Sequence, residues 1–127
     1  MNVIFIDDDE DLNFLQTRMC TRSKIVTHFF IASSGLQTLN YLSGNPVPPD
    51  VIFVDINMPV MSGFEFIEEF EKKFQTQFPD TLLYVVSSSV RSNDKKLAMQ
   101  YKSVQDFIVK PLTEEKLEEI YYSMVKS

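Results

Sequence analysis

Five short apolar runs alternate with five amphipathic stretches along the chain, and this alternation constrains the fold more than any other feature. The apolar runs are rich in β-branched and aromatic residues, as strands are, and they lie at 3–6, 25–32, 51–54, 82–86 and 107–109. Strands that alternate with helices pair in parallel through right-handed crossovers. The pattern therefore predicts an α/β doubly wound, five-stranded parallel sheet with the five helices on both faces.

The stretches between these runs carry the signals of helices. Apolar residues recur at helical spacing in 10–22, 36–42, 64–74, 97–101 and 117–124. Cap signals precede three of these stretches: they are the capping box of Ser62 and Glu65, the polar cluster 92–94, and Thr113. The spacing predicts that Leu15 and Leu36 lie on apolar faces and that Tyr101 belongs to the fourth helix.

Size and composition are those of a small acidic domain. The 127 residues suit one domain, and twelve Lys and Arg against eighteen Asp and Glu give a net charge of −6. Nucleic-acid binding through a basic face needs clustered Lys and Arg, so the charge balance argues against this class of partner. The single cysteine makes no internal disulfide, and no apolar run approaches the ~18 residues of a membrane helix. The first residues have neither a basic region nor a sustained apolar segment, so we expect no signal peptide. We expect a cytoplasmic protein without membrane insertion.

Polar residues follow the predicted strands at the point where each strand ends. They are Asp7, Asp8 and Asp9 after the first strand, Asp55 after the third, Ser87 after the fourth and Lys110 after the fifth. The carboxyl ends of parallel strands meet at one edge of a sheet, and ligands bind there where the strand order reverses. We expect the flavodoxin-like order 2-1-3-4-5, which places Asp7 and Asp8 beside Asp55.

A cluster of Asp7, Asp8 and Asp55 suggests a cation site. Carboxylates a few Å apart repel by roughly 1–4 kcal/mol per pair at an intermediate dielectric, which a raised pKa or a bound cation relieves. Without nearby His or Cys, the oxygen ligands favour Mg²⁺ over Zn²⁺. Lys110 adds a positive charge and Ser87 a hydroxyl, so the edge offers the groups that can cradle a phosphoryl group.

At these positions the sequence resembles the receiver domain of bacterial two-component response regulators, over essentially the whole chain. Four motifs carry the resemblance in order: they are Ile6-Asp7-Asp8-Asp9, Val54-Asp55-Ile56-Asn57-Met58-Pro59 with Met61-Ser62-Gly63, Val86-Ser87-Ser88, and Val109-Lys110-Pro111. Two features depart from the family pattern. Ser88 replaces a small Ala or Gly, and 102–105 replace the Gly-Ala turn before the fifth strand.

The resemblance implies a metal site and a phosphoacceptor. Asp55 would accept a phosphoryl group from phosphohistidine on a histidine kinase or a histidine phosphotransfer protein. Mg²⁺ would be bound by Asp8, by Asp7 through a water, by an Asp55 oxygen and by the backbone carbonyl of Asn57.

The resemblance also implies a switch. Ser87 would be the switch hydroxyl, Lys110 would pair with the phosphoryl group, and Phe107 would be the aromatic switch, with a plain strand-core role for Phe107 equally open. The family has a cis peptide bond at this position, so the resemblance implies a cis bond between Lys110 and Pro111. Ser89, together with Asn57, resembles the family's rate-tuning positions.

As a whole, the resemblance implies a phosphorelay signalling protein that is not an enzyme, although it assists its own phosphorylation and dephosphorylation. Phosphorylation would switch the face of the fourth helix, fifth strand and fifth helix for a downstream protein target, and a phosphorylation-dependent homodimer fits the same face. Tyr101, Tyr121 and Tyr122 are candidate contacts there, or simply core and rim residues. Residues 1–127 are expected to form the receiver domain alone, with no output domain.

Two other functions remain open from the residues. A haloacid-dehalogenase-like phosphatase would use Asp7 and Asp9, although Asp11 stands where that family has Thr or Val. A receiver-fold module that signals without phosphorylation is the second, although the intact acids and Lys110 argue against it. His28 is interpreted as a packed strand residue and Cys20 as helix core.

Overall fold

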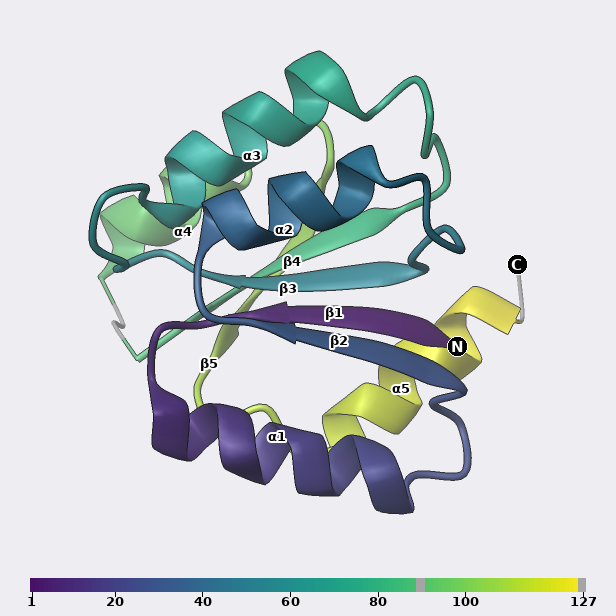
Figure 1. Cartoon of the computed structure of the whole chain (residues 1–127). Helices are drawn as coiled ribbons and strands as arrows, with labels where there is room; N and C mark the ends of the chain where they lie inside the picture. The colour runs from purple at the N-terminus through teal and green to yellow at the C-terminus, as the bar shows by residue number, and fades with distance from the viewer. Residues whose placement is uncertain (89–90, 126–127) are drawn as a thin grey trace.

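A computed structural model describes residues 1–88 and 91–125 of the chain. Strands and helices alternate strictly along it (Figure 1). The strands are β1 (Asn2–Ile6), β2 (His28–Ala32), β3 (Val51–Asp55), β4 (Leu82–Ser87) and β5 (Val104–Val109). The helices are α1 (Glu10–Arg22), α2 (Gly35–Ser43), α3 (Gly63–Lys73), α4 (Ser92–Ala98) and α5 (Glu114–Val125). All neighbouring strands pair in parallel in the order β2-β1-β3-β4-β5, which confirms the predicted fold.

The sheet lies between two helical layers, each with its own apolar core. Figure 1 shows α2, α3 and α4 on one face of the sheet and α1 and α5 on the other. On the first face, Ile52 and Val54 of β3 pack with the aromatic stripe of α3, whereas Phe53 of the same strand joins the core under α1 and α5. Because β3 is central and buried at every residue, its sequence is apolar throughout until Asp55.

Two strands begin three residues away from the predicted position, and β1 begins one residue early, at Asn2. The expected strand from residue 25 begins only at His28, because the backbone amides of Ile25 and Val26 donate to the Ser23 hydroxyl (3.2 and 3.3 Å) and form a turn. Conversely, β5 begins at Val104, three residues early. On this edge strand the polar residues Gln105 and Asp106 interrupt the apolar run, so the hydrophobic pattern does not reveal where the strand begins.

Some helical expectations were wrong. Leu15 and Leu36 are 59% and 55% exposed. The reason is that each helix buries a different side: α1 buries Gln16, Met19 and Cys20, and α2 buries Gly35, Thr38, Leu39 and Leu42. The cluster 92–94 lies inside the first turn of α4, with Arg91 at the N-cap. Tyr101 lies beyond α4, where its ring stacks on Phe64.

Other local predictions were confirmed. The capping box of Ser62 and Glu65 starts α3, and the Thr113 hydroxyl accepts the backbone amide of Lys116 (3.1 Å) at the start of α5. Cys20 is buried in the core, as interpreted. His28, in contrast, is exposed rather than packed, and its Nδ1 lies 3.1 Å from the side-chain oxygen of Asn2.

Candidate functional site

The carboxyl ends of β1, β3 and β5 bring the predicted site together. Asp7 directly follows β1, Asp55 is the last residue of β3, and Lys110 directly follows β5. Since Ile6 pairs with Val54 in register, the two aspartates emerge side by side. The strand-end argument from the sequence therefore places these groups correctly.

Three carboxylates form the centre of the site. One oxygen from each of Asp7, Asp8 and Asp55 lies within 4.8 Å of the others. Asp7 and Asp55 are buried, at 4% and 7% exposure, whereas Asp8 is open to solvent. Carboxylate oxygens at this spacing are hard ligands for a small divalent cation.

Lys110 balances part of the negative charge of the buried pair. Its Nζ donates to Asp7 Oδ2 at 2.7 Å and lies 3.4 Å from Asp55 Oδ1. Burial lowers the pKa of this ammonium, but its hydrogen bond to Asp7 and the charge of Asp55 outweigh burial and raise it. The backbone amide of Lys110 donates to the Ser87 carbonyl (2.8 Å), and the following bond to Pro111 is cis. Lys110 is therefore charged, and its contacts with both carboxylates hold its side chain over the acids.

The surroundings of Asp55 disfavour its charged form. Loss of solvent raises the pKa of its carboxyl, the charge of Asp7 raises it further, and Lys110 only partly opposes the two effects. The ionised carboxylate is consequently a group that gains from any added positive charge. This property suits both a metal ligand and a nucleophile towards phosphorus.

The remaining predicted residues surround this centre at different depths. Ser87 ends β4 and is fully buried. Phe107 is half-buried, pairs in register with Val85 and packs on the core of the α2–α3–α4 face. The side chain of Asn57 is exposed, two residues beyond Asp55. Ser89 lies outside the described residues.

The loop after Asp55 returns tightly to its own strand end. The backbone amide of Gly63 donates to the Ile56 carbonyl (2.8 Å), and a Cβ on Gly63 would lie 2.3 Å from the Asp55 carbonyl oxygen. Glycine is therefore required here, and the Ser62 capping box then starts α3. In the same loop Val60 has φ 69° and is completely exposed.

The donor set fits Mg²⁺. Ligands on opposite sides of an octahedral Mg²⁺ ion are about 4.2 Å apart, so oxygens within 4.8 Å of one another need only small side-chain movements to bind it. The described residues offer oxygen rather than nitrogen or sulfur at this position. The same set agrees poorly with a zinc site.

Asp9 is used for another purpose. Its carboxylate caps α1 by accepting the amides of Asp11 (3.0 Å) and Leu12 (3.2 Å), and its side chain is exposed. A phosphatase of the kind considered above would use this carboxylate together with Asp7. Because the Asp9 carboxylate instead caps α1, the structure does not favour the phosphatase alternative.

Asn13, in the first turns of α1, was missed by the sequence analysis. Its side-chain amide donates to the Asp7 carbonyl at 2.7 Å. A single Asn on a helix gives no periodic or motif signal, and only the contact in space reveals it.

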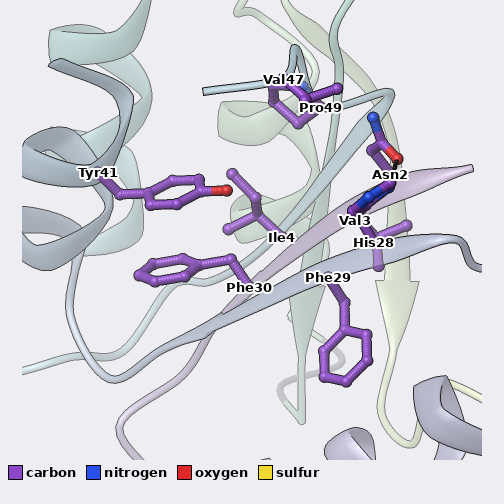
Figure 2. Close-up of a pocket in the computed structure, with 9 residues that line it drawn as sticks. All are labelled: Asn2, Val3, Ile4, His28, Phe29, Phe30, Tyr41, Val47 and Pro49. Carbon is purple, nitrogen blue, oxygen red and sulfur yellow. Dashed lines mark hydrogen bonds between the residues drawn. The ribbon is translucent and has the colours of Figure 1, made fainter. Parts of the chain in front are cut away.

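A separate cavity of about 70 Å³ lies at the opposite ends of the strands (Figure 2). Its lining is mostly apolar and includes Ile4, Val47 and the stacked rings of Phe30 and Tyr41 (centroids 3.9 Å apart). Because it opens at the amino ends of β1 and β2, the cavity is not part of the acidic site.

Comparison with known proteins agrees with this geometry. The response regulator receiver domain family matches residues 3–122, and the chain belongs to this family. The crystal structure of a two-component response regulator from Cytophaga hutchinsonii is 30% identical, with 99% of this chain and 97% of that chain covered and a TM-score of 0.87. A response regulator receiver protein from Dyadobacter fermentans is 26% identical, with 98% of each chain covered and a TM-score of 0.85.

The curated relatives are longer proteins. The sensor histidine kinase CheAY of Helicobacter pylori is 28% identical over 98% of this chain, which spans 15% of that protein. The sensor histidine kinase TmoS of Ectopseudomonas mendocina is 27% identical, and the chain spans 11% of it. In the part of the chain that the structure describes, no helix is long and apolar enough to cross a membrane.

Proposed function

We propose that residues 1–127 act as a receiver domain in which Asp55 is the phosphoacceptor and phosphohistidine on a histidine kinase or phosphotransfer protein is the donor. One observation carries the proposal: Asp55 is a buried carboxylate at a strand end, 3.4 Å from the Lys110 ammonium and clustered with two further acids. Relatives that include sensor histidine kinases support this class of partner. Kinases of this class use cytoplasmic ATP, so we place the transfer in the cytoplasm.

The chemistry is an in-line transfer between two side chains. An Asp55 oxygen attacks phosphorus, a new O–P bond forms, and the N–P bond of phosphohistidine breaks with its electron pair left on the imidazole. Lys110 balances charge on the phosphoryl oxygens, and Ser87 donates its hydroxyl to one of them. Asp7, Asp8, Asp55 and the Asn57 carbonyl would hold Mg²⁺, which supplies further neutralisation of phosphoryl charge when bound.

The output is a shift between two states of one face. Phosphorylation adds about −1.5 to −2 charge beside the buried end of β4. Ser87 moves towards the new oxygens, and Phe107 turns into the space that opens. Because Phe107 lies on β5, this change alters the surface of α4, β5 and α5 that meets a downstream protein or a second copy of the chain. The protein thereby signals rather than turns over a substrate, apart from assisting its own phosphorylation and dephosphorylation.

Intact mass measurement tests the proposal with the protein alone. Wild type and Asp55→Asn are incubated with acetyl phosphate and Mg²⁺, with and without prior addition of a chelator. We expect one phosphoryl group on wild type, none on Asp55→Asn, and none in the presence of the chelator. Equal labelling of Asp55→Asn would refute the phosphoacceptor assignment, and labelling unaffected by the chelator would refute the metal requirement.

A further inference from the structure

The turn that carries the two adjacent acids is fastened by a side chain of α1. Asn13 Nδ2 donates to the Asp7 carbonyl oxygen at 2.7 Å. The other polar groups of Asp7 are also bonded: its amide donates to the Ala32 carbonyl, Oδ1 accepts the amide of Asp9, and Oδ2 accepts Lys110. Asn13 therefore completes the hydrogen bonding of Asp7, at the carbonyl of the peptide bond that joins Asp7 to Asp8.

Asp8 depends on that backbone. Its carboxylate is exposed, and within residues 1–88 and 91–125 it makes no hydrogen bond or ion pair. Asp7 and Asp55, in contrast, are both held by Lys110. Without such contacts, the position of the Asp8 side chain follows that of its backbone, which begins at the peptide plane that contains the Asp7 carbonyl.

We propose that Asn13 is a positioning residue for the metal site: by holding the Asp7 carbonyl, it fixes the peptide plane that aims Asp8 at the cation. The proposal rests on the metal binding proposed above and deepens it. Partners that orient a ligand from outside the first coordination sphere typically change metal affinity by about 10–100-fold when removed. Asn13 acts one bond further away, so we expect the lower end of this range.

The second polar atom of Asn13 separates this role from a structural one. Its Oδ1 is buried and has no hydrogen-bond partner in the described part of the chain. Leucine has nearly the same shape and removes both the donor and this unsatisfied acceptor. Asn13→Leu also leaves the Asp7 carbonyl without this partner, so the two effects oppose each other and the metal-free fold should change little in stability, while the hold on the Asp7 carbonyl is lost.

The test uses Mn²⁺ as the probe, with the free ion measured by electron paramagnetic resonance. We expect Asn13→Leu to weaken Mn²⁺ binding about tenfold, with little change in the urea midpoint without metal. Thr17→Val is the matched control, because it removes a hydrogen bond to the Asn13 carbonyl (2.9 Å) on the same helix and leaves the Asp7 contact intact. Its Mn²⁺ affinity should equal that of wild type.

A double-mutant cycle shows whether Asn13 acts through Asp8. In an Asp8→Asn background, Asn13→Leu should change Mn²⁺ affinity by less than about twofold, because the ligand to be aimed is gone. Equal affinity of wild type and Asn13→Leu, or the same loss in both backgrounds, would overturn the inference while leaving the metal site standing. Absence of Mn²⁺ binding by wild type would instead overturn the metal site itself.

Discussion

Replacing Asp55 with asparagine should make the metal-free protein more stable at pH 7. At an effective dielectric of 20, Lys110 at 3.4 Å attracts the carboxylate by about 5 kcal/mol. Asp7, within 4.8 Å, repels it by about 3.5 kcal/mol or more, and the exposed Asp8 adds about 1 kcal/mol at the dielectric of water. These contributions nearly cancel, so the sign of the change in stability depends on the cost of desolvating the Asp55 carboxylate, whose residue is 7% exposed. Asparagine keeps the shape without the charge, and we expect a gain of about 1–2 kcal/mol.

The pH dependence of this gain follows from the raised pKa of Asp55, whose main cause is burial. A carboxyl with a raised pKa in the folded state binds more protons there than in the unfolded chain. Its contribution to stability is present below the ordinary pKa of 3.8 and is lost as the pH rises through the folded value. The advantage of Asp55→Asn should therefore be small at low pH and largest at neutrality.

Urea unfolding followed by circular dichroism measures both effects, in chelator and at several pH values. Asp8→Asn is the control, because its exposed carboxylate should contribute much less. Mg²⁺ should reverse the order, since a ligand at 100 times its Kd stabilises wild type by about 2.7 kcal/mol. A metal-free Asp55→Asn protein less stable than wild type at pH 7, or a pH-independent difference, would refute the reasoning.

Three further predictions concern the surroundings of the site and the core. Gly63→Ala should lower the free energy of unfolding by about 2–4 kcal/mol, because its Cβ would meet the Asp55 carbonyl at 2.3 Å; an unchanged urea midpoint would contradict this. Val60→Gly should raise the same free energy by about 1 kcal/mol, because a β-branched residue is strained at φ 69°; a loss of stability would show that Val60 makes a contact of greater value. The Cys20 thiol is buried and its pKa is raised to about 11, so iodoacetamide at pH 8 should alkylate native protein at least ~100-fold more slowly than urea-unfolded protein, and equal rates would contradict the burial.

The sequence correctly predicted the parts of the fold in which burial alone determines the residue types. The central strand β3 is buried on both faces, so its run of apolar residues is unbroken and ends only at Asp55. The parallel arrangement then brought strand-end residues to one edge without any knowledge of contacts. Asp7 and Lys110, which are 103 positions apart, were placed together by this argument and are joined at 2.7 Å.

The predictions failed where position in the fold overrides local pattern. The edge strands β2 and β5 have one neighbour each, so polar residues such as Asp106 are tolerated and blur their limits. Leu15 lies on the apolar stripe of α1 yet is exposed, because the helix meets the sheet through the side that carries Gln16. Asn13 could not be predicted as a site residue, since its contact with a backbone carbonyl leaves no pattern in the sequence.

The identity of the residue that carries the phosphoryl group is the most direct test of the account. The protein is phosphorylated with acetyl phosphate and Mg²⁺, reduced with borohydride, which converts an aspartyl phosphate to homoserine, and mapped by peptide mass spectrometry. The account predicts homoserine at position 55 alone. Homoserine at position 7 or 9 would contradict it and would instead favour a phosphatase that uses Asp7 and Asp9.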